Sequence, residues 1–226
     1  EAHWQYAFGD DIHRKYTDPL IEEDLRNFLT VQYKDKNLTT SEMDSIVANL
    51  RNTGGQNDYY ALRNAFLLYR DGYDFAYSDG RDNPFRLEYI DFEHPDHNIF
   101  RCVNQFVMEQ GRENRRPDIL LFINGIPVCI IELKNPTKQN ATIHDAHTQI
   151  CTRYMRDIPA LLKYCALAVI SDGAKNALGT TYTPFEFFYE WKKIENEDKA
   201  GKGLDTLRTL IRGALSPERI LEILRD

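Results

Sequence analysis

The sequence is poor in cysteine and has no paired-cysteine motif. Its 226 residues include four cysteines, at positions 102, 129, 151 and 165, and no two of them have the CxxC spacing. Three of the four lie inside apolar runs, which is typical of reduced cysteines that pack in a protein interior. A disulfide framework and a zinc finger are therefore not expected.

Long apolar runs are also missing. A membrane-spanning helix needs about 20 consecutive apolar residues, and no stretch of the chain approaches that length. No signal peptide precedes the first predicted strand, so we expect a cytoplasmic protein with no membrane partner. The hydrophobic content of 42% and the charged content of 28% are those of an ordinary globular protein. The length suits one large domain, or a core with an appended helical piece.

Positive charge is in deficit. The chain has 28 Lys and Arg against 35 Asp and Glu, which gives a net charge of −7. Affinity for nucleic acids comes largely from cations that meet phosphates, so strong independent DNA binding is not expected. A site for a divalent cation remains compatible with this charge, because clustered carboxylates are the groups that hold such an ion. No GxxxxGK[ST] loop is present, so this segment is not expected to bind or hydrolyse ATP.

Apolar residues recur at helical spacing over the first third of the chain, and strand-like runs begin near residue 73. The order predicts an α/β fold with three segments: a helical part at 1–72, a core at 73–190 and C-terminal helices at 191–226. The stretch TPFEFFYEW at 183–191 is either a helix or an irregular aromatic segment. The expected helices cover 19–33, 40 to the Gly54-Gly55 stop, 58–70, 142–156, 204–214 and 217–225, and the expected strands cover 87–92, 98–109, a hairpin at 117–134, and 166–171.

The hairpin carries the charged residues that stand out most. The stretch RRPDILLFINGIPVCIIELKN, residues 115–135, places Asp118 before one apolar run and Glu132 and Lys134 at the end of the next. Two strands folded back on each other bring the three side chains to one edge of a sheet, in the pattern PD-(x)n-(D/E)xK. Two carboxylates there can bind a divalent cation, and a lysine can stabilise charge at a phosphorus atom. Without further context, such residues are more typical of exposed strand ends.

The register of the hairpin tests this hypothesis. Side chains alternate along a strand, so Asp118 and Glu132 share a face only if paired residue numbers have an even sum. A strict two-residue Asn124-Gly125 turn sets Asp118 opposite Ile131 and sends Glu132 to the other face. We therefore predict a three-residue loop, 124–126, with Ile123 paired to Pro127 and Asp118 to Glu132, or else a nearby bulge.

The context of the hairpin resembles a known family. RPDILLFINGIPVCIIELKNP, with FRCVNQF before it and RYMRDIPALLKYCALAVISDG after it, looks like the N-terminal nuclease domain of the type I restriction enzyme R subunit. The resemblance covers roughly residues 85–190 strongly and the helical flanks more loosely. It implies a restriction-endonuclease-like core, αβββαβ, with a mixed sheet flanked by helices and with extra N- and C-terminal helices.

The resemblance also implies an activity, that of a type I site-specific deoxyribonuclease cleaving double-stranded DNA with Mg²⁺. Asp118 and Glu132 would be metal ligands together with the carbonyl of Leu133, and Lys134 would be the catalytic lysine. The implied partners are C-terminal motor domains of the same chain, where ATP would act, and separate specificity and methylation subunits.

The family also has a Gln-x-x-x-Tyr motif on the helix after the hairpin. Here Gln149 is followed by a tyrosine only at position 154. Positions four apart share a face of an α-helix, whereas positions five apart diverge, so Gln149 is the safer assignment. Tyr154 fits only if the helix is locally distorted.

Other polar residues carry weaker hypotheses. Glu22 and Glu23 could add a carboxylate to the metal site, or simply favour the positive end of a helix dipole. His144 and His147 could form a metal pair, although a solvated face is the simpler interpretation. The Ser-Asp-Gly at 171–173 is more typical of a turn. Four cations near the hairpin could contact the DNA backbone or neutralise nearby carboxylates: Arg112, Arg115, Arg116 and Lys138.

One alternative from another functional class stays open. The same fold could serve as a docking or DNA-guiding module whose catalysis is weak or lost. The acidic net charge and the shifted position of Tyr154 favour this alternative, and the intact Asp118, Glu132 and Lys134 set argues against it.

Overall fold

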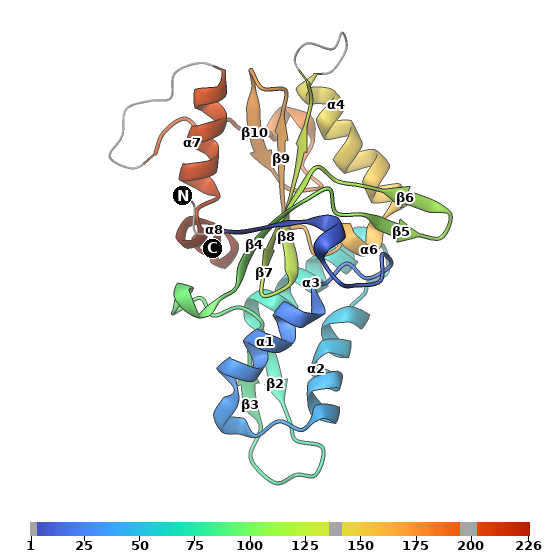
Figure 1. Cartoon of the computed structure of the whole chain (residues 1–226), viewed down its shortest axis with the longest axis vertical. Coiled ribbons are helices and arrows are strands. Elements are labelled where there is room, and N and C mark those ends of the chain that lie inside the picture. Colours follow the sequence, from blue (N-terminus) through green and yellow to red (C-terminus); the bar gives the residue numbers. More distant parts are fainter. Residues whose placement is uncertain (1–3, 136–141, 195–202) are drawn as a thin grey trace.

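A six-stranded mixed sheet runs through the centre of the molecule, and helices cover both of its faces (Figure 1). The computed structural model describes residues 4–135, 142–194 and 203–226. The sheet has the order β1-β4-β7-β8-β9-β10, and two small ribbons, β2-β3 and β5-β6, lie outside it. The strands are β1 (Gln5–Phe8), β2 (Tyr73–Phe75), β3 (Phe85–Leu87), β4 (Phe100–Asn104), β5 (Met108–Gln110), β6 (Glu113–Arg115), β7 (Ile119–Ile123), β8 (Ile126–Leu133), β9 (Leu167–Ser171) and β10 (Asn176–Gly179).

The helices follow the sequence prediction closely. A capping box between Thr39 and Glu42 starts α2, and Gly72 ends α3 with a positive φ of 68°. No helix within the described ranges is both long enough and apolar enough to cross a membrane. The helices are α1 (Glu22–Gln32), α2 (Thr40–Asn52), α3 (Asp58–Asp71), α4 (Ile143–Thr148), a π-helix (Gln149–Tyr154), α5 (Met155–Asp157), α6 (Pro159–Leu162), α7 (Leu204–Ala214) and α8 (Pro217–Arg225), and the 3₁₀ turns are Gly9–Asp11, Lys34–Lys36, Pro95–His97 and Phe185–Phe187.

The topology confirms the predicted fold class. Strands β4, β7 and β8 are joined antiparallel in sequence order, and β8 then pairs in parallel with β9. A parallel pair needs a crossover, which the helices from α4 to α6 provide. With α1 to α3 ahead of the strands, the order is the αβββαβ of a restriction-endonuclease-like core.

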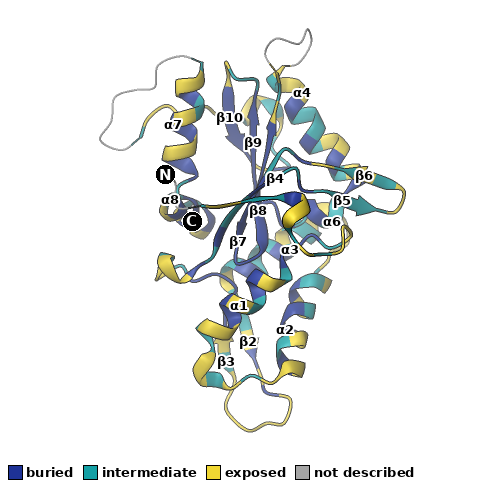
Figure 2. Cartoon of the chain, viewed as in Figure 1, coloured by how far each residue is buried: buried dark blue, intermediate teal, exposed yellow. Residues whose placement is uncertain are grey.

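Two apolar clusters lie on the two faces of the sheet. The first joins α1 to α3, α7 and α8 to one face, and the second joins the α4–α6 segment to the other. Strands β7, β8 and β9 are buried along almost their whole length (Figure 2). Near-continuous apolar strands are expected where helices cover both faces. All three predicted segments of the chain contribute to the first cluster, from Leu20 to Leu224.

Several strands differ from the prediction. The expected strand at 87–92 is wrong beyond Leu87, because this backbone bonds to buried amides and not to a neighbouring strand. Asn124 donates to the carbonyl of Tyr89, and Asp91 N donates to Asn98. The expected strand at 98–109 is broken where Gln105 adopts a φ of 55°.

Two strands of the sheet, β1 and β10, have no counterpart in the prediction, and β1 pairs in parallel with β4. The aromatic stretch after Thr183 forms the irregular alternative, with a 3₁₀ turn and an isolated bridge between Leu178 and Tyr189. The four cysteines are all free, as expected, and two of them are fully buried.

Candidate functional site

The turn between β7 and β8 has two residues, so the predicted three-residue loop is wrong. Asn124 and Gly125 both have positive φ, at 50° and 76°, and Ile123 pairs with Ile126. The alternative of a nearby bulge is what the structure contains. Phe122 pairs with Pro127 and Leu121 with Cys129, so Val128 is the extra residue.

This bulge decides which face of the sheet Glu132 occupies. Val128 and Cys129 are consecutive, yet both belong to the apolar cluster that faces α1 to α3. Ile130 then turns to the cluster on the α4 side, and the alternation continues to Glu132. Asp118 lies two residues before Leu120, which belongs to the same α4-side cluster. The bulge thus places both carboxylates on one face, as the prediction required.

Glu132 is the most buried member of the group, with 2% of its surface exposed. Burial, together with the nearby negative charge of Asp118, raises the pKa of Glu132 to about 7. Lys134 acts in the opposite direction, because its Nζ donates to Oε1 of Glu132 at 3.0 Å. The protonation of Glu132 therefore depends on both its burial and its lysine partner.

Asp118 lies beside Glu132 at the mouth of an open cavity of about 400 Å³. Its Oδ2 accepts a hydrogen bond of 2.8 Å from the amide of Leu133. The cavity is lined by residues at the ends of β4, β7 and β8: Asn104, Gln105, Asp118, Ile119, Leu133, Lys134 and Asn135. Asp118, Leu133 and Lys134 therefore border one hollow that is open to solvent, and Glu132 is buried behind them.

Lys134 is positioned by two partners and not by one. Its Nζ donates to Oε1 of Glu132 and also to Oε1 of Gln149. The amide nitrogen of Gln149 in turn donates to Glu132. The backbone amide of Lys134 donates to the carbonyl of Ser171 at 2.7 Å, which fixes the end of β8 against β9.

The helix that carries Gln149 is locally distorted, and the distortion brings Tyr154 into the site. Residues 149–154 form a π-helix, in which the hydrogen bonds span five residues. Gln149 Nε2 therefore lies 2.6 Å from the hydroxyl of Tyr154, which also donates to Oε2 of Glu132 at 3.3 Å. Burial and the nearby Glu132 raise the pKa of Tyr154 above its ordinary value, so the hydroxyl keeps its proton.

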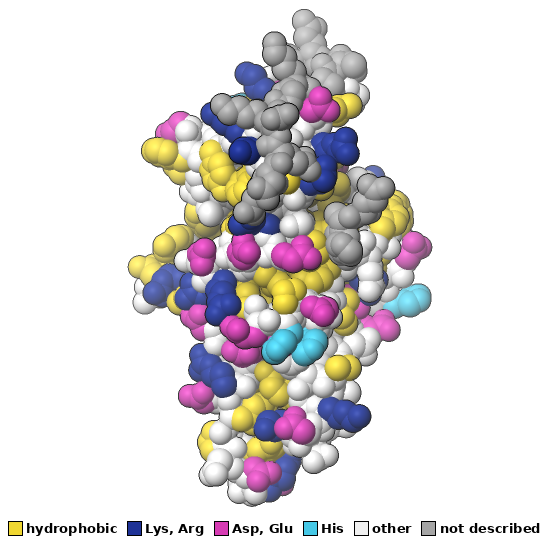
Figure 3. Space-filling view, turned by 90° about the vertical axis from the view of Figure 1, so that its left-hand side faces the viewer, with side chains coloured by type: hydrophobic (Ala, Val, Ile, Leu, Met, Phe, Trp, Pro, Cys, Tyr) yellow, Lys and Arg dark blue, Asp and Glu magenta, His cyan; other side chains and the backbone are white. Residues whose placement is uncertain are grey.

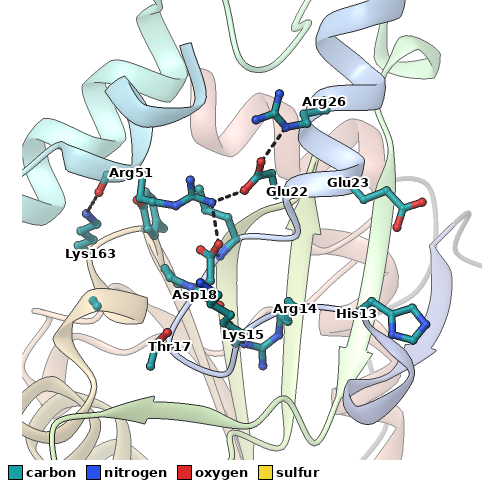
Figure 4. A pocket seen from close by; sticks show the side chains of 14 residues that line it. His13, Arg14, Lys15, Thr17, Asp18, Glu22, Glu23, Arg26, Arg51 and Lys163 are labelled. Carbon is teal, nitrogen blue, oxygen red and sulfur yellow. Dashed lines mark hydrogen bonds and ion pairs between the residues drawn. The ribbon is translucent and has the colours of Figure 1, made fainter. Parts of the chain in front are cut away.

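Glu22 and Glu23 do not belong to this site. Helix α1 begins beside the hairpin tip, where the amide of Ile21 donates to the carbonyl of Gly125. The tip lies one strand length from Asp118, roughly 20 Å at 3.3 Å per residue. Glu22 pairs with Arg26 and Arg51 in a separate hollow of about 840 Å³, and Glu23 points away from that network (Figure 4).

The residues of the predicted basic cluster differ in their surroundings: one is bound in ion pairs and two are exposed. Arg115 is bound to Asp157 at 2.7 Å and to Glu113, so its charge is already neutralised. Arg112 and Arg116 are exposed, on the β5-β6 ribbon and at its base. Lys138 lies outside the described residues.

The weaker candidates have structural partners of their own. His147 Nε2 lies 2.9 Å from the carbonyl of Thr183, and its ring and that of His144 pack against Phe185. Oδ1 of Asp172 accepts from the amides of the two residues that follow Gly173, which is the predicted turn. Neither feature joins the carboxylate site.

One neighbour of the site is missing from the prediction. The side chain of Gln105 lies 3.5 Å from Oδ1 of Asp118, and its amide donates to the Asp118 carbonyl. The only signal in the sequence is a polar Asn104-Gln105 pair that interrupts an apolar run. This pair comes close to Asp118 only because Asn104 pairs with Ile119 in the antiparallel sheet, and local sequence patterns do not predict that pairing.

The fold and the site together define a class of protein: a restriction-endonuclease-like core. Strands β7 and β8 place two carboxylates and a lysine together at one edge of its sheet. The family described as "Type I restriction enzyme R protein N terminus" matches residues 1–187, and the chain belongs to it.

Curated relatives agree with this family. The chain is 29% identical to the "Type I restriction enzyme HindI endonuclease subunit" of Haemophilus influenzae, over 98% of this chain and 22% of that subunit. It is 28% identical to the "Putative type I restriction enzyme MjaIXP endonuclease subunit" of Methanocaldococcus jannaschii, over 99% of this chain and 24% of that subunit. A third relative is the "Type I restriction enzyme EcoprrI endonuclease subunit" of Escherichia coli, 31% identical over 55% of this chain and 40% of the relative. The chain thus spans about a quarter of the length of the first two relatives.

Proposed function

We propose that this chain is a Mg²⁺-dependent endonuclease domain of a type I restriction enzyme R subunit, hydrolysing phosphodiester bonds of double-stranded DNA. The observation that carries the proposal is the network at the end of β8. Glu132 is joined there to Lys134, Gln149 and Tyr154, with Asp118 on the same face. A buried carboxylate with a raised pKa beside a lysine is typical of functional sites.

The donor set fits Mg²⁺, because the ion prefers oxygen ligands and keeps several waters. Asp118 and Glu132 would supply carboxylate oxygens, and Leu133 would supply its carbonyl. When bound, the ion supplies Lewis-acid polarisation of a phosphoryl oxygen and a more acidic bound water. Asp118 is held for this task by the amide of Leu133 at Oδ2 and by the side chain of Gln105 at Oδ1.

Lys134 would stabilise the negative charge that develops on the phosphorus substituents. Gln149 restrains both partners at once, since it accepts from Lys134 and donates to Glu132. Tyr154 restrains both Gln149 and Glu132, because its hydroxyl accepts a hydrogen bond from Gln149 and donates one to Glu132. Gln149 and Tyr154 are therefore positioning residues, and their loss should weaken catalysis less than the loss of Lys134.

We further propose that the DNA is delivered by other parts of the enzyme. The partners would be motor domains of the same chain, where ATP acts, together with specificity and methylation subunits. Cations and carboxylates are interspersed on the face in Figure 3, and among its described residues no continuous basic stripe crosses it. The net charge of −7 supports the same division of labour.

The test is cleavage of a plasmid that carries a recognition site, by the complete enzyme containing this chain, with Mg²⁺ and ATP. We expect Glu132→Gln and Lys134→Ala to reduce cleavage at least 100-fold. ATP hydrolysis should stay within about twofold, because the segment has no nucleotide-binding loop.

A matched control is Asp172→Asn, which removes a carboxylate from the end of the neighbouring strand β9. Its Oδ1 serves only its own turn, and asparagine retains that acceptor. Cleavage by the control should equal that of the parent. Undiminished cleavage by Glu132→Gln and Lys134→Ala would replace the nuclease proposal with a docking or DNA-guiding module.

A further inference from the structure

A second group of metal-ligating side chains lies on the loop before β4, far from the carboxylate site. Oδ2 of Asp91 lies 2.9 Å from Nδ1 of His97 and 3.3 Å from Nδ1 of His94. Among the described residues, these three alone form a set of His, Cys, Asp or Glu whose ligand atoms all lie within 4.8 Å of one another. The two imidazole rings are stacked, with centroids 4.8 Å apart, so both turn the same nitrogen toward one oxygen.

Hydrogen bonds from buried residues hold the loop that carries this group. Asp91 is 4% exposed, and its other oxygen, Oδ1, accepts from the amides of Glu93 and His94. The buried Asn98 donates to the carbonyl of Asp91 and accepts from its amide. Asn124 holds Asn98 in turn, with a bond of 2.8 Å. These hydrogen bonds hold the Asp91 carboxylate and the backbone of the loop in place.

We propose that Asp91, His94 and His97 bind one divalent transition metal ion of the zinc class. Bonds of 2.0 to 2.1 Å in a tetrahedral site separate the ligand atoms by about 3.3 Å. The Asp91 oxygen lies 2.9 and 3.3 Å from the two imidazole nitrogens, which is close to that separation. Imidazole nitrogens with one carboxylate oxygen suit Zn²⁺, Co²⁺ or Ni²⁺ and not Mg²⁺. Both histidine side chains are more than half exposed, so an ion can reach them from solvent.

The surroundings of the three ligands leave room for a further ligand and separate the ion from the carboxylate site. Gln32 of α1 donates to the same Oδ2 at 3.0 Å, so its amide lies at the edge of the site. A water molecule would complete the coordination. The site lies near the tip of the β7-β8 hairpin, at the end opposite Asp118, and is thus separate from the proposed nuclease chemistry.

The position of the site suggests what the ion does. The turn Pro95–His97 packs against α8, and Glu93 pairs with Arg225 near the end of that helix. An ion held by three residues of this loop would stiffen the loop where it accepts a hydrogen bond from Gln32 of α1 and packs against α8. We expect a structural role, in which binding stabilises the folded chain in proportion to its affinity.

Titration of the chain with Zn²⁺ and with Co²⁺ tests the proposal, in calorimetry and in the visible absorption of bound Co²⁺. A background of Asp118→Asn with excess Mg²⁺ removes competition from the other carboxylates. We expect one equivalent to bind, and His94→Ala/His97→Ala to weaken that binding at least tenfold. The Co²⁺ spectrum should show the intense bands of tetrahedral coordination, and Zn²⁺ should raise the melting temperature.

The matched control is His144→Ala/His147→Ala, which also removes two histidines three residues apart. His147 is occupied by the carbonyl of Thr183, so the control should bind one equivalent with unchanged affinity. Circular dichroism checks that the exposed histidines are dispensable for folding. Asp91→Asn serves as a second variant, because asparagine keeps an oxygen that can accept from the amides of Glu93 and His94. No binding by the parent, or equal loss in the control pair, would overturn the proposal.

Discussion

Gln149 and Tyr154 are five residues apart on one helix, yet their side chains meet at 2.6 Å. A regular α-helix turns about 100° per residue, so such a pair diverges by about 140°. The π-helix absorbs the extra residue and returns the tyrosine to the face that covers Glu132. The shifted spacing in the sequence is therefore compatible with the same site geometry as a spacing of four.

Deletion of Thr152 should convert the π-helix to an α-helix without loss of the site. Thr152 is exposed, and its removal leaves the glutamine and the tyrosine four apart, again on one face. We expect an equal or higher melting temperature in calorimetry and plasmid cleavage within about tenfold of the parent. Deletion of the exposed Ser45 from α2 is the control, because it rotates the remaining helix by about 100° and should destabilise the fold. Equal damage from the two deletions would contradict this account.

Glu132→Gln should stabilise the metal-free chain at pH 8 while it removes activity. Burial raises the pKa of Glu132 from 4.5 to about 7, so the folded state binds this proton more tightly than the unfolded chain. Stability therefore falls as the pH rises from about 4.5 through about 7, by roughly 3 kcal/mol. The glutamine cannot ionise and avoids this loss, at the cost of its contact with Lys134.

Urea unfolding of both proteins at pH 5 and pH 8, in the presence of a chelator, measures the effect. The gain in the glutamine variant should be large at pH 8 and small at pH 5. A variant that is less stable than the parent at pH 8 would show that Lys134 neutralises Glu132 fully.

Gly125→Ala should destabilise the fold by about 2 to 4 kcal/mol. The residue has a φ of 76°, and an added Cβ would lie 2.1 Å from the carbonyl oxygen of Ile21. Gly111→Ala separates the two causes, because its φ is 61° and nothing lies within 4 Å of the added atom. We expect it to cost only about 1 kcal/mol in denaturant unfolding. Equal costs at the two positions would mean that the contact between α1 and the hairpin tip is unimportant.

Glu42→Gln should lower the melting temperature at neutral pH and make it less sensitive to acid. Hydrogen bonds from Arg81 and from the amide of Thr39 lower the pKa of Glu42 to about 2. The stabilisation is complete above the unfolded pKa of about 4.5 and is lost as the pH falls toward 2. Thermal melts between pH 7 and pH 2.5 should therefore converge for parent and variant at the acid end. Glu186→Gln, at an exposed position, should follow the parent throughout.

Much of the architecture was predictable because it follows from local periodicity. Helices α2, α3, α7 and α8 have clear apolar faces, and α2 and α3 end near the glycines that the sequence offers as stops. Strands β7, β8 and β9 are apolar because both faces of the sheet are covered. Strand β1 was not predictable, since only its pairing with β4 makes an ordinary polar and aromatic stretch extended.

The sequence by itself determined which chemical groups are available to the candidate site, because side-chain type does not depend on folding. Asp118, Glu132 and Lys134 stand out by residue type and order, and Gln149 follows from the resemblance to the family. What the tertiary structure decided is which of them meet. The bulge at Val128 selects the face, the π-helix admits Tyr154, and the position of α1 excludes Glu22. Each is a departure from regular geometry that neighbouring elements impose, and the sequence pattern assumes regular geometry.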